Sequence, residues 1–217
     1  MTEKDSSEKQ PEHMPHKQEG SHKPRAPQQT HNMLLRSTQV YGVMLLISLA
    51  IIGYEHKNIQ TIVNVFVAQD IWHYWLSIGC VGSMISLTVG HIFRLVFSSY
   101  RQHRALVLHS LGGVSLPGTI YLALLAAISE ELLFRGALQP YLGVFMTSLT
   151  VTLLQVSPDF RLTAWSLFIG INSMMLGLLF GYTKSLIPGM MIQFILNLSC
   201  LLPKHFIRSD FTPKKIK

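Results

Sequence analysis

Two carboxylates and a guanidinium lie close together in the segment SEELLFRG, Ser129 to Gly136. The flanking segments, YLALLAAI and GALQPYLGVF, are almost entirely apolar. Ionisable groups are costly to bury in a membrane helix, and they commonly mark a functional site or a buried ion pair. The chemistry of this chain is therefore expected at Glu130, Glu131 and Arg135.

Helix geometry gives the two glutamates different roles. Glu131 and Arg135 are four residues apart and share a helix face, so we predict an ion pair between them. Glu130 is rotated by about 100° from Glu131 and has no partner in its own helix. A carboxylate of this kind suits a general base or acid, and we expect it to face a cavity. The alternative, in which all three side chains only hold helices together, stays open.

The sequence EELLFRG followed by ALQPYLG resembles the signature of the CAAX-protease and bacteriocin-processing family of intramembrane endopeptidases. That family has a Glu-Glu-x-x-x-Arg motif, then Phe-x-x-x-His, then His-x-x-x-Asn or His-x-x-x-Asp. Residues 176–197, LGLLFGYTKSLIPGMMIQFILN, resemble its third block. The resemblance covers roughly residues 117–200. It implies that the first Glu and the second-block His activate water, and that the third-block His and Asn stabilise the oxyanion.

The first and third blocks carry over onto this chain with one change. The motif positions match at Glu130, Glu131, Arg135 and Asn197. Gln193 stands where the third block has its His. Because a carboxamide can donate a hydrogen bond to an oxyanion, this replacement is chemically tolerable.

The second block departs further from the family pattern. We place it at LLQVSPDF, where Gln155 replaces Phe and Asp159 replaces His. If Asp159 approaches Glu130, the two carboxylates can share a proton and activate water together. If it stays at the solvent edge, it is a loop residue. Three other histidines are candidates to substitute, and nothing in the sequence chooses among them: His91, His109 and His205.

The segments around these motifs predict an all-α fold, a polytopic integral membrane helix bundle with about six transmembrane helices. The six predicted spans are 40–54, 74–97, a third from Pro117 into the motif, 143–157, 162–182 and 186–202. Residues 59–72 are predicted as an interfacial helix, and Trp72 and Trp75 as interface anchors. Residues 98–104, SSYRQHR, are predicted as a basic loop.

Composition agrees with a membrane protein. Of 217 residues, 13% are charged and 48% are hydrophobic, and the mean hydropathy is +0.32. Since the first apolar run begins near Val40, we expect no cleaved signal peptide. Only Cys80 and Cys200 are available, both in apolar runs, so no disulfide framework or thiolate metal site is expected. Four groups of basic residues fall on one side of six spans and only Lys57 and Lys184 on the other, which predicts that both termini are cytoplasmic. We expect the membrane to be a bacterial-type cell (inner) membrane.

The chain divides into four predicted parts: a disordered polar tail over 1–32, transmembrane helices and the basic loop over 33–116, the protease-like core over 117–202, and a basic tail over 203–217. The first tail carries five basic and five acidic residues, and its histidines are either solvated or metal-binding. The last tail carries five basic residues against one acidic, which favours an anionic membrane face over nucleic acid as its partner.

Three functions remain open from the sequence. The first is an intramembrane endopeptidase that hydrolyses a membrane-anchored or prenylated peptide with water activated by Glu130. The second is an inactive relative that binds peptides as an immunity, scaffold or chaperone protein. The third is a small transporter that uses Glu130 in proton coupling. We expect no cofactor and no metal, because two Glu, one Asp and two carboxamides lack the His ligands that zinc favours.

Overall fold

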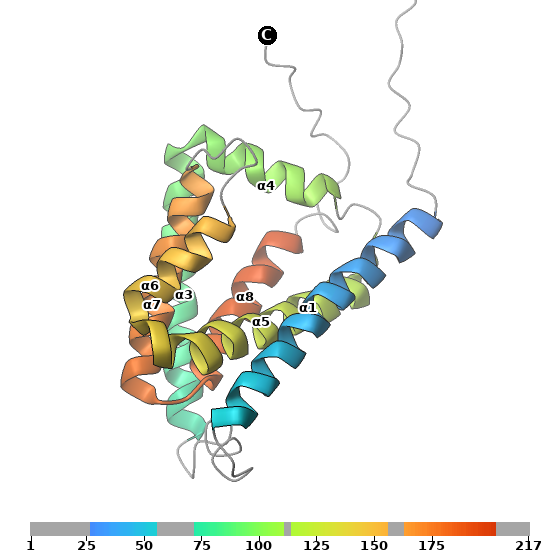
Figure 1. The fold of residues 1–217 in the computed structure, drawn as a ribbon. Helices are drawn as coiled ribbons and strands as arrows, with labels where there is room; N and C mark the ends of the chain where they lie inside the picture. Colours follow the sequence, from blue (N-terminus) through green and yellow to red (C-terminus); the bar gives the residue numbers. More distant parts are fainter. Residues whose placement is uncertain (1–26, 56–71, 111–113, 156–162, 203–217) are drawn as a thin grey trace, which may run out of the picture.

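A computed structural model describes residues 27–55, 72–110, 114–155 and 163–202, and every regular element in these ranges is helical. The elements are α1 (Pro27–Glu55), α3 (Trp72–Val96), α4 (Ser98–Ser110), α5 (Leu116–Glu131), the π-helix η1 (Leu132–Leu138), α6 (Gln139–Leu154), α7 (Ala164–Thr183) and α8 (Ile187–Leu201). Figure 1 shows them packed as one bundle. The predicted all-α membrane bundle is confirmed.

Among the described residues, four helical stretches are long and apolar enough to cross a membrane: Asn32–Tyr54, His73–Val96, Leu116–Leu154 and Ala164–Thr183. Helix α8 is apolar but shorter, with 15 residues. The third stretch has 39 residues, about twice what a bilayer needs. It is interrupted at Gly143, whose φ of 72° and ψ of 171° are open to glycine and strained for other residues. Six spans result only if this stretch counts as two and α8 counts as one.

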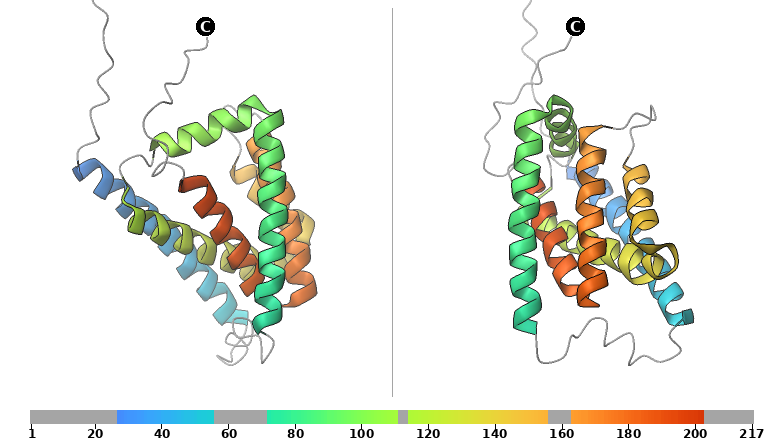
Figure 2. Two further views of the ribbon diagram at one scale, coloured as in Figure 1. Left: turned by 180° about the vertical axis from the view of Figure 1, so that it is seen from behind. Right: turned by 90° about the vertical axis from the view of Figure 1, so that its left-hand side faces the viewer.

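Helix α8 lies in the middle of the bundle, with α3 on one side and α5 on the other (Figures 1 and 2). Helix α1 runs beside α5, while α7 packs against α6 and α3. The approach of α8 to α3 depends on small residues. A side chain at Gly79 would put its Cβ 2.8 Å from Met191 Sδ. Small residues at membrane helix interfaces allow such close backbone packing, which brings the polar residues of α8 into the interior.

The predicted basic loop at 98–104 is wrong, because these residues form the first half of α4. This helix crosses the end of the bundle (Figure 1). Its Tyr100 is buried and meets the Phe168 ring edge-on, with centroids 5.5 Å apart. The His103 ring stacks on Trp165 at 4.9 Å. Packing against α7 thus stabilises a helix whose polar composition resembles that of a loop.

The structure corrects two further predictions. Helix α1 begins at Pro27, so residues 27–32 are helical and the predicted disordered tail is too long. Trp75 is buried rather than placed as an exposed interface anchor. The predicted interfacial helix, apart from Trp72, and the basic tail at 203–217 lie outside the described residues.

Candidate functional site

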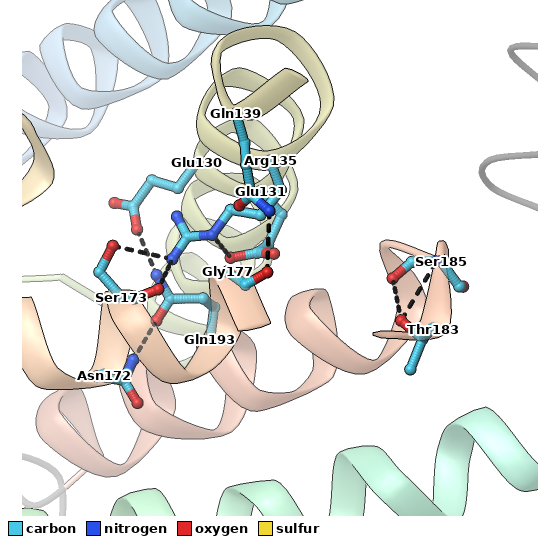
Figure 3. A network of polar contacts seen from close by, with 10 residues as sticks. All are labelled: Glu130, Glu131, Arg135, Gln139, Asn172, Ser173, Gly177, Thr183, Ser185 and Gln193. Atoms are coloured by element: carbon cyan, nitrogen blue, oxygen red, sulfur yellow. Dashed lines mark hydrogen bonds and ion pairs between the residues drawn. The ribbon is translucent and has the colours of Figure 1, made fainter. Parts of the chain in front are cut away.

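The predicted ion pair is present in the bundle core. Arg135 Nε lies 3.7 Å from Glu131 Oε1, and each side chain is 1% exposed. Arg135 Nη2 also donates to the backbone oxygen of Ser173 at 3.0 Å and to its Oγ at 3.1 Å (Figure 3). The pair therefore ties the α5–η1 segment to α7.

A π-helix carries the second half of the motif. In η1 the backbone N–H of Gln139 donates to the carbonyl of Phe134, five residues earlier. We attribute the wide turn to Pro140, which has no N–H and whose ring would clash with the carbonyl of Gly136 in an α-helix. Turns of this kind often lie at functional sites. Here it turns Arg135 and Gln139 toward α7.

Gln139 extends the contact made by Arg135 by one helical turn. Its Nε2 donates to the carbonyl of Gly177 at 2.9 Å (Figure 3). A Cβ at position 177 would lie 3.1 Å from Gln139 Oε1, so glycine leaves room for the amide. The sequence analysis missed Gln139. A sequence feature that could have identified it is its position four residues after Arg135, on the same helix face.

Glu131 is also in contact with α8. A Cβ built at Gly189 would lie 2.8 Å from Glu131 Cδ and closer still to Oε2. Gly189 is in the first turn of α8, where the positive end of the helix dipole favours a carboxylate. The Glu131 carboxylate is therefore enclosed between Arg135 and the start of α8.

Glu130 points away from this pair and has its own partner. Its Oε2 accepts a hydrogen bond from Gln193 Nε2 at 2.9 Å (Figure 3). Gln193 Oε1 accepts from Asn172 Nδ2 at 3.4 Å, and Asn172 Oδ1 accepts from Ser86 Oγ at 2.8 Å. We call these four residues the amide chain. It joins α5, α8, α7 and α3, and it brings together two of the predicted site residues, Glu130 and Gln193.

Asn172 was missed by the sequence analysis. A usable signal was present, because Phe168 and Asn172 have the spacing of the family's Phe-x-x-x-His motif. The residues chosen for that block are placed differently. Gln155 ends α6 with an exposed side chain, and its backbone oxygen accepts from Ser166 Oγ. Asp159 lies outside the described residues.

Asn197 lies one turn beyond Gln193 on the same face of α8. Its Nδ2 is buried and makes no hydrogen bond to any described residue. Buried amide donors are normally satisfied, so this donor is available to a water or another acceptor that is not part of the chain.

Two described histidines, His91 and His103, make contacts with residues other than Glu130. His91 is exposed and shares a hydrogen bond with Arg94, and His103 stacks on Trp165. The side chain of His109 and all of His205 lie outside the described part of the chain. Within that part, no three His, Cys, Asp or Glu side chains gather into a metal-binding group.

The expected cavity beside Glu130 is not one of the two best-formed hollows among the described residues. The larger, about 520 Å³, is an apolar groove between α3 and α7. The smaller, about 20 Å³, is lined in part by Ser86 and Asn172. Glu130 lines neither of these two hollows.

Comparison with known proteins matches the segment that carries this geometry. Residues 112–199 match the family model described as Type II CAAX prenyl endopeptidase Rce1-like. Over that segment the family resemblance is confirmed. The two motif blocks described above, from Glu130 to Arg135 and from Gln193 to Asn197, both lie inside the matched segment.

One curated relative is the uncharacterised protein YpbD of Bacillus subtilis (strain 168). It is 38% identical over 101 residues, which are 44% of this chain and 51% of that protein. The chain thus spans about half the length of this relative. No solved structure gives a significant match. The family model and the apolar helices together identify an integral membrane protein with a CAAX-endopeptidase-like segment.

Proposed function

We propose that this protein hydrolyses a peptide bond in a membrane-anchored or lipidated peptide, with water activated by Glu130. The observation that carries the proposal is the hydrogen bond from Gln193 to Glu130 within the family-matching segment. It joins the first Glu of the first motif to the third-block His position. Those two positions are the ones to which the resemblance assigns water activation and oxyanion stabilisation.

The proposed reaction uses the second oxygen of Glu130 and the unpartnered amide nitrogen of Asn197. Gln193 holds one oxygen of Glu130, which leaves the other to accept a proton from water. The water oxygen then bonds to the scissile carbonyl carbon, and the carbonyl oxygen becomes an oxyanion. The unpartnered Nδ2 of Asn197 supplies a donor for that oxyanion. Glu130 returns the proton to the departing nitrogen as the C–N bond breaks, giving a carboxyl and an amine.

Asn172 replaces Asp159 in our assignment of the second block. It belongs to a Phe-x-x-x-Asn sequence, and it hydrogen-bonds to Gln193, which in turn holds Glu130. In this assignment both motif histidines are replaced by carboxamides. Asn172 orients Gln193, so it is a positioning residue. Glu131 and Arg135 position the helix that carries Glu130 and take no proton.

A second candidate is an inactive relative that binds membrane peptides without cutting them. It is favoured by Asn172 and Gln193, whose carboxamides stand at the two motif-histidine positions in this assignment. A carboxylate surrounded by carboxamides can recognise peptide N–H and C=O groups without transferring protons. For either function we propose a bacterial-type cell membrane, in line with the Bacillus subtilis relative. We propose cytoplasmic termini, since Arg94, Arg101 and Arg104 gather at one end of the bundle.

Glu130→Gln tests the proposal. Wild-type protein and the variant are purified in detergent and given a library of membrane peptides, some with C-terminal lipids. New peptide termini are read by mass spectrometry, and photo-crosslinking measures binding. Because Gln keeps the shape and hydrogen-bonding capacity of Glu but not its basicity, we expect cleavage to fall by about 100-fold or more, with crosslinking retained.

The control is Lys184→Gln, an exposed position at the far end of α7. It should cut at the wild-type rate. Crosslinking without cleavage in wild type and variant alike would reject hydrolysis in favour of the binding function. Neither crosslinking nor cleavage by folded wild-type protein would reject both.

A further inference from the structure

Helix α4 lies across one end of the bundle, at the ends of α3 and α7 (Figures 1 and 2). Its inward face carries Tyr100, His103 and Arg104, and the first two pack on aromatic residues of α7. Its outward face is polar and exposed, with Arg101 and Gln102. A helix placed in this way at the end of apolar spans lies in the plane of a membrane interface.

Hydrogen bonds from two arginines of α4 tie this helix to the ends of α3 and α8. Arg101 Nη1 donates to the carbonyls of Arg94 at 2.9 Å and Leu95 at 3.1 Å, which are in the last turn of α3. Arg104 Nη2 donates to the carbonyl of Ser199 in α8 at 2.9 Å. The corner between α3 and α4 is therefore a defined surface, with the Arg101 guanidinium held beside the end of the preceding span.

Within the described residues, the positive charge of this corner has no acidic partner. Arg94 and Arg101 are exposed, and helices α3, α4, α7 and α8 contain no acidic residue. Next to the two guanidiniums, the apolar side chains of Leu95 and Val96 are 64% and 65% exposed. Positive charge beside exposed apolar side chains fits the boundary between lipid headgroups and acyl chains better than it fits a soluble anion.

We propose that this basic corner (Arg94, Leu95, Val96 and Arg101) binds the phosphate of an anionic phospholipid in the leaflet at the α4 end. The guanidiniums contact the phosphate, and Leu95 and Val96 contact the upper part of the acyl chains. The site is separate from Glu130, and it does not depend on hydrolysis.

The test uses full-length protein in nanodiscs of phosphatidylglycerol and phosphatidylcholine mixed in equal parts. Native mass spectrometry counts the two lipids that stay bound after release from the disc. Wild type should retain phosphatidylglycerol preferentially. Arg94→Gln/Arg101→Gln should lower that preference by roughly 25-fold, since each surface arginine contributes a factor of about five. High salt should lower it in wild type too.

Two matched variants separate charge from folding. Arg94→Lys/Arg101→Lys keeps both charges and should keep most of the preference, and Lys184→Gln removes one charge at the opposite end and should change nothing. If the double Gln variant does not fold, Arg94→Gln alone should still lower the preference by about fivefold. Equal preference in wild type and either Gln variant, or an equal loss in Lys184→Gln, would overturn the proposal.

Discussion

Arg135 places a full positive charge where only 1% of its side chain is exposed. Its compensation comes from Glu131 and from the backbone and hydroxyl oxygens of Ser173. Arg135→Ala would leave the Glu131 carboxylate buried without its partner. Loss of one member of a buried pair costs about 3–5 kcal/mol, so we expect the variant to unfold at a markedly lower temperature or to be recovered poorly. Thermal unfolding in detergent measures this.

The matched comparison is Glu131→Gln/Arg135→Met, which removes both charges together and fills similar volume. It should be less destabilised than Arg135→Ala, because no unpaired charge remains. If Arg135→Ala is as stable as wild type, the pair is not structural and its place in the mechanism must be reconsidered.

His103 gives the protein a pH-dependent contact outside the membrane spans. Burial lowers the pKa of His103 from its usual value, because the charged ring is poorly solvated against Trp165. The folded protein therefore prefers neutral His103. This contribution to stability is present above the unfolded-state pKa of about 6.5 and is lost as the pH falls below it.

The measurement is the unfolding temperature of wild type and of His103→Phe from pH 8 to pH 5. Phe keeps an aromatic ring on Trp165 and cannot be protonated, so its unfolding temperature should fall less over that range. Parallel curves for the two proteins would show that His103 does not titrate between its folded and unfolded states in this way.

At the scale of residues, the sequence predicts contacts within one helix better than contacts between helices. The Glu131–Arg135 pair followed from a spacing of four residues alone. The sequence placed Gln193 and Glu130 in the same site but did not predict the contact between them, because that contact joins α8 to α5. Asn172 was overlooked because its role depends on how α7 faces α8, and spacing does not fix that orientation.

Among the elements, α8 has the tightest contact with the motif. Gly189→Ala would drive a methyl group into the Glu131 carboxylate, so α8 must move or Glu131 must turn. We expect a loss of about 1–3 kcal/mol in stability and a longer Glu130–Gln193 distance, hence slower cleavage. Gly181→Ala is the control, because a Cβ there meets nothing within 4 Å and should be neutral or slightly stabilising.

This prediction is checked by measuring the unfolding temperature and the cleavage rate of Gly189→Ala, Gly181→Ala and wild type. A Gly189→Ala variant with wild-type stability and rate would show that the start of α8 shifts without cost, and that Glu131 does not set the position of Gln193. A similar loss in Gly181→Ala would point to glycine flexibility as the cause instead of the steric contact.

The elements that the sequence predicted well are the ones that hydropathy controls. The apolar runs in α1, α3, α7 and α8 were located to within a few residues of the observed helices, apart from the early start of α1. Helix α4 was mistaken for a loop because its stability comes from Tyr100 and His103 packing on another helix. The π-helix was missed because its cause, Pro140, lies after the segment that it widens.

At the scale of the whole molecule, the direction of α7 predicts which end of the protein faces the cytoplasm. Trp165, near the start of α7, stacks on His103 of α4, while Lys184 follows the end of α7 about 30 Å away. The α4 end carries Arg94, Arg101 and Arg104, so we expect it to face the cytoplasm. In a variant with Cys80 and Cys200 changed to serine, Lys184→Cys should react with an impermeant maleimide in intact cells, and Ser99→Cys only after permeabilisation. The reverse pattern would invert the topology, and labelling of both sites in intact cells would show that α7 does not cross the membrane.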